Sequence, residues 1–322
     1  MKYIYAPVRI TVYNRFDHFK RCIESLARCT GADQTELFIG IDYPKSEADR
    51  PGNARIREYA DSISGFKAVH LSKRDKNLGQ LLNGRDLLSQ IRERGFDRFI
   101  DLEDDLEFSP GFLEYMNQCL EKYKDDSRVA VVCGYSYPEW EEVGDYPYNA
   151  FPLHGFCAWG TGIWMGKMPE YHDFMSAREI VFSPRIVRKL FREKMHVTVH
   201  RLMYRYETSP ADLRRRCYCV LEGKYCIFPV ASKVRNHGFD GSGSHCARID
   251  KYEEQMIDGA ASFVLDDFEI REYPQIQELF NKQYSPNWKV RFLVRAEYLL
   301  FRITGKCFHD FAPLRSLMQS RL

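Results

Sequence analysis

The sequence predicts an α/β protein in which a mostly parallel sheet is covered by helices. Short apolar runs alternate along the first half of the chain with segments of helical periodicity, and this order is typical of parallel sheets. Hydrophobic residues make up 44% and charged residues 29% of the 322 residues, which is ordinary globular composition. No apolar run reaches the length of a membrane span. The expected strands are 8–12, 37–41, 68–71 and 98–102.

The expected helices lie between these strands. After the first strand, apolar residues recur at helical spacing from Phe19 to Ala27, and Asp17 is the expected N-cap. A second helical stretch lies within 45–64, and a third begins at 77–79. In parallel sheets, ligands bind beyond the carboxyl ends of the strands. The first candidates for a binding site are therefore the polar residues that follow the strands: Asn14 and Arg15, Asp42, and Glu103, Asp104 and Asp105.

The second half of the chain is less regular. A loop rich in Tyr, Pro and Trp spans 135–148, and a charged helical segment spans about 176–206. We expect a short strand at 217–219, because its two cysteines would share one face of a sheet. Residues 238–245 are expected to form a loop, since three glycines weaken any helix or strand there.

Charge and cysteine content exclude several classes of protein. Lys and Arg number 47 and Asp and Glu 45, so the net charge of +2 is too small for nucleic-acid binding by bulk charge. The ten cysteines include no CxxC pair and no zinc-site spacing, which argues against a disulfide framework or a structural zinc site. The first residues are expected to form a strand, because Pro7 and Arg9 interrupt any signal-like apolar run. We expect reduced thiols and a cytoplasmic location.

The segment 287–322 differs from the rest of the chain. It carries seven Lys or Arg against two Asp or Glu, and apolar residues are interleaved with these charges. A basic amphipathic helix of this kind can lie on an anionic membrane. A terminal helix that docks on its own domain fits the pattern equally, and the sequence leaves both interpretations open.

Four carboxylates follow the fourth expected strand within five residues. Glu103, Asp104, Asp105 and Glu107 would repel one another unless a cation lay among them. Such oxygen ligands suit Mg²⁺ or Mn²⁺ bound together with a substrate phosphate. A solvated acidic turn is the alternative, but the apolar strand before it and an expected helix cap at 109–112 after it disfavour that interpretation. A phosphatase of the haloacid type is not indicated, because its DxDx motif is absent.

The stretch 103–115, EDDLEFSPGFLEY, resembles the acidic motif of inverting glycosyltransferases with the GT-A fold. The similarity is greatest to the N-acetylglucosaminyltransferase I type and to bacterial polysaccharide-building relatives. In that family the last Asp of the motif holds a divalent metal that bridges the nucleotide diphosphate, and Asp105 matches it here. The resemblance implies Mn²⁺ or Mg²⁺ as cofactor and a Rossmann-like GT-A sheet with an irregular acceptor-side half. Glu103 and Asp104 are assigned to donor binding beside the metal.

Other residues match the family by their order along the chain. Arg15 matches an Arg near the donor, and Asp42 matches the Asp that reads the uridine. The stretch 160–164, GTGIW, resembles a Gly-x-Gly-Trp segment, with an extra Ile, and implies that Trp164 contacts the substrate. The catalytic base corresponds to Asp212 by order alone, because the family's motif around the base is not matched here.

Further candidates each have a plain structural alternative. His245 lies in the glycine-rich loop, which could fold over the diphosphate so that the imidazole reaches the metal; an exposed loop histidine is the alternative. Asn77 and Gly79 could lie against the nucleotide or could only cap the following helix. Trp159 and Trp164 could stack on a sugar, while burial in the core explains a Trp equally well.

The resemblance also implies a division of the chain and a reaction. Residues 1–246 would form the catalytic domain, with a nucleotide-sugar half at 1–134 and an acceptor half at 135–246, followed by a helical extension at 247–322. The implied reaction moves a hexose or N-acetylhexosamine from a UDP-sugar to a hydroxyl of a glycan or lipid-linked acceptor. UDP-GlcNAc is one of the implied donors. It proceeds with inversion and belongs to bacterial surface polysaccharide synthesis. The implied location is the cytoplasm, with peripheral contact at the inner face of the plasma membrane through 287–322, and no nucleic acid is expected as a partner.

Two other functions stay open. A non-catalytic GT-A-like scaffold of a polysaccharide assembly complex would tolerate Asp105→Ala and Asp212→Ala, because neither carboxylate would have chemistry to perform. A sugar nucleotidyltransferase usually has a glycine-rich loop after its first strand, and residues 12–16 contain no glycine.

Overall fold

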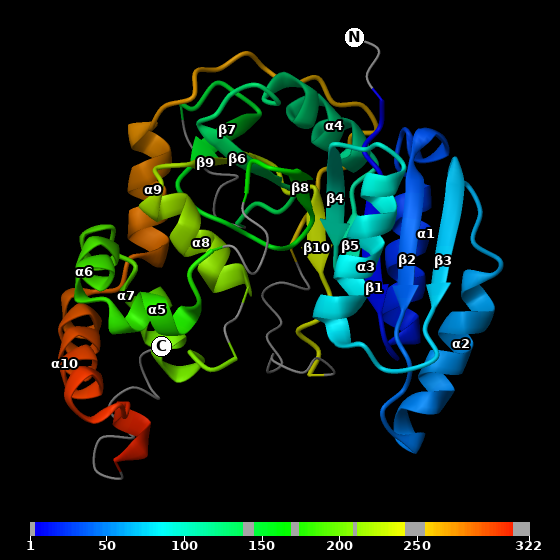
Figure 1. Ribbon diagram of the computed structural model, residues 1–322. Coiled ribbons are helices and arrows are strands. Elements are labelled where there is room, and N and C mark those ends of the chain that lie inside the picture. Colours follow the sequence, from blue (N-terminus) through cyan, green and yellow to red (C-terminus); the bar gives the residue numbers. More distant parts are fainter. Residues whose placement is uncertain (1–3, 138–144, 169–173, 209–210, 242–254, 312–322) are drawn as a thin grey trace. The chain divides into compact units, whose positions relative to one another are not determined.

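The computed structural model describes residues 4–137, 145–168, 174–208, 211–241 and 255–311, the side chains of 283 and 284 aside (Figure 1). The chain forms two compact units. Unit 1 comprises Met1–Pro152, Cys157–Met168 and Cys226–Arg271. Unit 2 comprises Leu153–Phe156, Pro169–Tyr225 and Glu272–Leu322. These compact units interleave along the sequence, whereas the functional division at residue 246 stays a prediction.

A mixed sheet of eight strands confirms the predicted α/β class, and its order is β3-β2-β1-β4-β8-β6-β9-β7. The pairs β1–β2, β2–β3 and β1–β4 are parallel, as the alternation of strands and helices predicts. Strand β8 is antiparallel to both β4 and β6. The strands are β1 Val8–Val12, β2 Glu36–Ile41, β3 Ala68–Lys73, β4 Arg98–Leu102, β6 Val129–Cys133, β7 Ala150–Leu153, β8 Thr161–Trp164 and β9 Tyr225–Pro229.

Four helices accompany the strands of unit 1: α1 Phe16–Ala27, α2 Arg50–Ala60, α3 Gly79–Glu93 and α4 Phe112–Lys122. Helix α1 forms because Phe19, Cys22, Ile23 and Leu26 recur on one face, and all four are buried. Two predicted caps are wrong. Arg15 is the N-cap of α1 and Asp17 lies inside its first turn, while Gly111 precedes α4 without a side-chain cap.

A second, two-stranded sheet joins segments that are far apart in the sequence. Strand β5, Leu106–Phe108, pairs antiparallel with β10, Val234–Asn236, so that Glu107 lies opposite Arg235. This pairing brings the residues after Asn236 beside the acidic turn that precedes β5. The predicted loop at 238–245 is confirmed for 238–241, which form a turn, and 242–245 lie outside the described residues.

The described part of unit 2 is mainly helical. The predicted helical segment at 176–206 consists of three helices, and the short strand predicted at 217–219 is wrong because these residues lie inside α8. Three alternating residues are too few to distinguish a strand from a helix, and Leu213 and Cys217 pack into a helical core cluster instead. The helices are α5 Ala177–Phe182, α6 Pro184–Arg192, α7 His196–Tyr204, α8 Ala211–Leu221, α9 Pro274–Tyr284 and α10 Trp288–Thr304.

Helix α10 settles one part of the question about the C-terminal segment. Its residues Val290, Val294, Glu297, Tyr298 and Phe301 are buried, and the helix contacts α7. These residues therefore dock on their own unit, which is one of the two interpretations that the sequence leaves open. Among the described residues, no helix combines the length and the apolar character that crossing a bilayer requires.

Candidate functional site

The acidic turn between β4 and β5 lies beside the turn that follows β1. Because β1 and β4 are parallel neighbours, with Ile10 opposite Leu102, their carboxyl ends lie at the same edge of the sheet. Asp104 and Asp105 are 7% and 9% exposed there. The Arg15 guanidinium donates to Asp104 Oδ1 and lies 2.9 Å from Asp105 Oδ2. The sequence-predicted residues Arg15, Asp104 and Asp105 thus form one buried charge cluster.

The charged groups of this cluster shift the pKa values of Arg15 and Asp104. Burial lowers the pKa of Arg15, but Asp104 and Asp105 outweigh it, so that the pKa lies above the usual value. Burial raises the pKa of Asp104 to about 6, and Asp105 adds to the rise while Arg15 opposes it. One guanidinium beside two carboxylates leaves the group net negative at neutral pH. A second cation would therefore stabilise the pair.

His237 is a member of the site that sequence reasoning missed. Its backbone N–H donates to the Asp105 carbonyl at 2.9 Å, and its Nε2 lies 2.8 Å from Glu107 Oε2. The hydrogen bond from His237 lowers the pKa of Glu107, although burial opposes this shift. His18 of α1 approaches the same segment, with Nε2 3.2 Å from the His237 carbonyl oxygen. Only its position just before the glycine-rich loop distinguished His237 in the sequence.

Gly238 allows this close approach. A Cβ atom at residue 238 would lie 2.1 Å from Asp105 Oδ2 and 3.1 Å from Asn236 Oδ1. The Gly238 N–H also donates to Asn236 Oδ1 at 2.7 Å. Residue 238 therefore has to be glycine, because the Cβ atom of any other residue would displace the Asp105 carboxylate.

Two buried polar atoms of the site have no hydrogen-bond partner among the described residues. They are Asp105 Oδ1 and His237 Nδ1, and a backbone hydrogen bond joins the two residues. A carboxylate oxygen and an imidazole nitrogen are ligands that suit Mn²⁺, and an orphaned buried atom requires an explanation. The residues present thus fit a divalent cation. Three or more His, Cys, Asp or Glu side chains do not converge on one point anywhere in the described part of the chain.

Asp42, Asn77 and Gly79 form a second group at the carboxyl end of β2. Asp42 Oδ1 accepts from Leu78 N at 2.8 Å, and its Oδ2 accepts from Gly79 N at 2.8 Å. Asn77 Nδ2 donates to the Tyr43 carbonyl at 2.7 Å. The structure therefore brings these three predicted residues together and shows Asp42 holding the beginning of α3. Gly79 has φ of +72°, which disfavours any other residue there.

The remaining sequence candidates lie elsewhere. Trp164 is 4% exposed and donates to the Leu120 carbonyl, and it pairs with Arg98 at the opposite end of β4 from the acidic turn. Trp159 lies closer to the site, with its ring 5.4 Å from that of Phe239, next to Gly238. Glu103 is half-buried in the acidic turn itself. Asp212 is exposed in the first turn of α8 in unit 2, and His245 lies outside the described residues.

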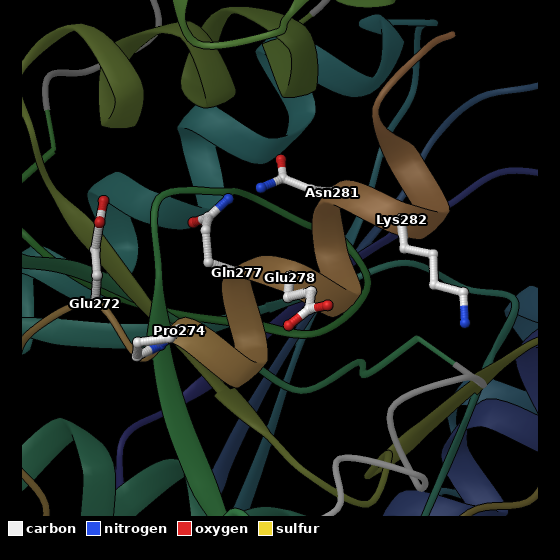
Figure 2. A pocket seen from close by; sticks show the side chains of 6 residues that line it. All are labelled: Glu272, Pro274, Gln277, Glu278, Asn281 and Lys282. Carbon is white, nitrogen blue, oxygen red and sulfur yellow. The ribbon is translucent and has the colours of Figure 1, made fainter.

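A hollow in unit 2 contains none of the predicted residues. The hollow has a volume of about 750 Å³. Figure 2 shows the side chains that line it along α9, among them two carboxylates and an amine. It is lined by Glu272, Pro274, Gln277, Glu278, Asn281 and Lys282. Neither the acidic turn nor the Asp42 group contributes to it.

Comparison with known proteins gives structural similarity only. Neither a protein-family model nor a curated protein matches the sequence. Among solved structures, TarS of S. aureus is 13% identical with a TM-score of 0.29, covering 39% of this chain and 20% of TarS. The TarS 1–349 fragment is 12% identical with a TM-score of 0.34, covering 49% of this chain and 46% of the fragment. A third structure is the mannosyltransferase PcManGT from Pyrobaculum calidifontis in complex with GDP-Man and Mn²⁺. It is 11% identical with a TM-score of 0.37, covering 68% of this chain and 69% of PcManGT.

This chain therefore spans a fifth of TarS and just under half of its fragment. At these identities and TM-scores, the activity has to be argued from the site itself.

Proposed function

We propose that the protein is an inverting, metal-dependent glycosyltransferase of GT-A type that uses a UDP-sugar. The observation that carries this proposal is the buried cluster of Arg15, Asp104, Asp105 and His237 at the carboxyl edge of the sheet. It combines a net negative group, two orphaned ligand atoms and an arginine, which together suit a metal-bound diphosphate. The motif at 103–115 supplies the reaction class.

Each residue has a role in this reaction. Asp105 Oδ1 and His237 Nδ1 would hold the divalent cation, which when bound supplies positive charge to the leaving diphosphate. Arg15 would add charge at the same edge. Asp212 would take the proton of the acceptor hydroxyl, whose oxygen forms the new bond to the anomeric carbon. The bond from that carbon to the diphosphate breaks, its electron pair leaves with UDP, and the configuration is inverted.

Donor and acceptor are assigned by resemblance and chemistry. UDP-GlcNAc is the first donor to test, and the acceptor is a hydroxyl of a glycan or lipid-linked sugar in bacterial surface polysaccharide synthesis. Asp42, Asn77 and Gly79 would lie toward the nucleotide, with Asp42 acting through the turn that it holds. The division at residue 246 and a cytoplasmic location belong to the same proposal.

The experiment that tests the donor site is calorimetric binding of UDP and several UDP-sugars, with and without Mn²⁺. We expect metal-dependent binding in the wild type, and its loss in Asp105→Ala and His237→Ala. Asp97→Ala is the matched control, because the Asp97 side chain is 78% exposed and lies outside the site. Absence of binding to every uridine nucleotide would contradict the proposal and would favour the scaffold.

A second measurement separates binding from catalysis. Asp212→Ala should bind the donor normally and lose transfer by about 10²–10⁴-fold, which is the usual contribution of a general base. Glu207→Ala, an exposed acid of the same unit, should keep full activity. Release of pyrophosphate from UTP and a sugar phosphate would instead identify a nucleotidyltransferase.

A further inference from the structure

The outer face of α10 carries an apolar stripe that the described residues leave exposed. Trp288, Phe292, Leu299 and Ile303 are 69%, 66%, 64% and 84% exposed. Their spacing of four, seven and four residues places them on one face of the helix. Single exposed apolar residues are ordinary, but four on one helical face form a patch. We call these four residues the α10 stripe.

The opposite face of α10 is buried, so the α10 stripe is separate from the face that packs on unit 2. Val290, Val294, Tyr298 and Phe301 are all buried, and they recur at the spacing of the face turned inward. This face of the helix therefore packs on unit 2, while the α10 stripe is exposed among the described residues. Docking on its own unit and contact with an outside surface are thus compatible in one helix.

The exposed charged residues of α10 itself are all positive. Lys289, Arg295 and Arg302 are exposed on α10, and Lys306 is exposed just after it. Glu297, the acidic residue of the helix, is 0% exposed and accepts hydrogen bonds from His200, Tyr204 and the Phe308 backbone. Asp310, beyond Lys306, is exposed and pairs with His309. An apolar stripe beside the positive charges of α10 is complementary to an anionic surface with an apolar interior.

The neighbouring helix α6 strengthens the positive potential. Its ring of Phe191 lies 5.8 Å from that of Tyr298, so α6 packs directly on α10. Four basic residues recur on α6 at helical spacing and are exposed: Arg185, Arg188, Lys189 and Arg192. They line a hollow together with Leu221 and Glu222, so they add to the positive charge of unit 2 as a whole.

We propose that unit 2 docks on an anionic lipid bilayer through the α10 stripe, with the basic residues of α10 contacting the headgroups. The apolar side chains would enter the boundary between headgroups and acyl chains while the helix lies in the membrane plane. This proposal concerns attachment and does not depend on the reaction proposed above.

The first test is co-sedimentation of the full chain with vesicles. We expect binding to vesicles of equal parts phosphatidylglycerol and phosphatidylcholine, weaker binding to phosphatidylcholine alone, and a decrease as salt rises. The charge variant Lys289→Gln with Arg295→Gln should bind about 30-fold more weakly, because each basic residue near the surface contributes about a factor of five. Lys20→Gln, an exposed lysine of unit 1, is the matched control and should bind as the wild type does.

The second test addresses the stripe directly. The double variant Phe292→Gln with Leu299→Gln should weaken vesicle binding by at least about tenfold. It loses the favourable free energy of moving two apolar side chains from water into the membrane. Met256→Gln removes an apolar side chain that is 69% exposed in unit 1, and it should leave binding unchanged. Both variants lie at exposed positions, so equal thermal unfolding temperatures would show that folding is intact.

A spectroscopic measurement locates the contact. Lipids brominated on the acyl chain should quench part of the tryptophan fluorescence of the wild type, and Trp288→Phe should remove that quenched part. Absence of vesicle binding, binding that ignores salt and both double variants, or quenching unchanged in Trp288→Phe would overturn the proposal. A dimer in sedimentation velocity that the stripe variant dissociates would also overturn it, because a second copy would then cover the stripe.

Discussion

Asp42 uses both carboxylate oxygens to hold the beginning of α3. Leu78 and Gly79 donate their backbone N–H groups to it, and Tyr43 donates a third at 2.9 Å. The first N–H groups of a helix lack partners within the helix, so a carboxylate from another strand satisfies them and also matches the positive end of the helix dipole. The sequence singled out Asp42 because it follows a strand and matches the uridine-reading Asp of the resembled family, and neither observation indicated its contact with α3.

We predict that Asp42→Asn lowers the free energy of unfolding by about 1–3 kcal/mol, because an amide offers one acceptor oxygen where two are used and Asp42 is 5% exposed. Urea unfolding measures the change. Asp61→Asn, at a side chain that is 65% exposed, should cost less than about 0.5 kcal/mol. Equal decreases in the free energy of unfolding of the two variants would show that the hydrogen bonds from α3 to Asp42 add no stability.

Gly238 provides the second prediction at the scale of single residues. Gly238→Ala should reduce Mn²⁺-dependent UDP binding by at least about tenfold. The new Cβ atom would lie 2.1 Å from Asp105 Oδ2, so the Asp105 carboxylate would have to move. Calorimetry measures the affinity, and circular dichroism checks that the fold persists. Gly259→Ala is the control, because a Cβ there meets nothing within 4 Å. Unchanged binding in Gly238→Ala would mean that the loop after β10 moves away from Asp105.

At the scale of elements, α7 buries a histidine whose charged form is disfavoured in the folded state. His196 is 1% exposed, stacks on Phe191 with a ring distance of 4.5 Å, and both ring nitrogens lack hydrogen-bond partners among the described residues. Burial, followed by the charges of Arg295 and Arg291, lowers its pKa to about 4, although a backbone contact with Lys194 opposes the shift.

The lowered pKa of His196 predicts that the protein becomes less stable as the pH falls below neutral. An unfolded histidine binds its proton near pH 6.5, whereas His196 in the folded state does so only near pH 4. The unfolded state therefore binds more protons between these values, and stability falls as pH decreases from about 6.5 to about 4, by up to about 3 kcal/mol.

Denaturant unfolding across this pH range measures the effect. His196→Phe should flatten the fall and raise stability by about 1 kcal/mol at neutral pH, because two unpaired nitrogens leave the core. His309→Gln, at a side chain that is 50% exposed, should leave the pH profile steep. A profile that His196→Phe does not alter would assign the loss to other groups.

Sequence reasoning about elements succeeded where the periodic run was long. The strands and helices of the first half were predicted because burial repeats over several turns or alternates over whole strands, as in α1 and β1. It was wrong at 217–219, where three residues cannot show a period. It was also wrong at Asp17, because the side chain that caps a helix depends on the direction from which the backbone enters.

At the scale of the whole molecule, the thiols are kept unreactive by burial. The structure describes nine cysteines outside disulfides, and all except Cys157 are buried. Burial raises the pKa of Cys29, Cys217 and Cys307 to about 12. The thiolate is the reactive form, so these residues are protected by both access and protonation.

We therefore predict slow modification of most thiols in the native protein. A disulfide reagent at neutral pH should label at most Cys157 and Cys246 quickly, and the eight buried thiols only after denaturation. Mass spectrometry of the labelled chain counts the modified residues. Fast labelling of Cys22 or Cys119 without denaturant would indicate that the core of unit 1 opens readily.

The sequence alone determined the class of the fold, the parallel strands of the first half and the acidic turn, because these depend on short-range periodicity and composition. Only the tertiary structure decided that His237 joins Asp105, that Asp42 holds α3, and that α10 leaves a stripe outward. The pairing of Glu107 with Arg235 joins residues 128 positions apart. Such contacts form because distant segments share one core, and no local window of sequence contains that information.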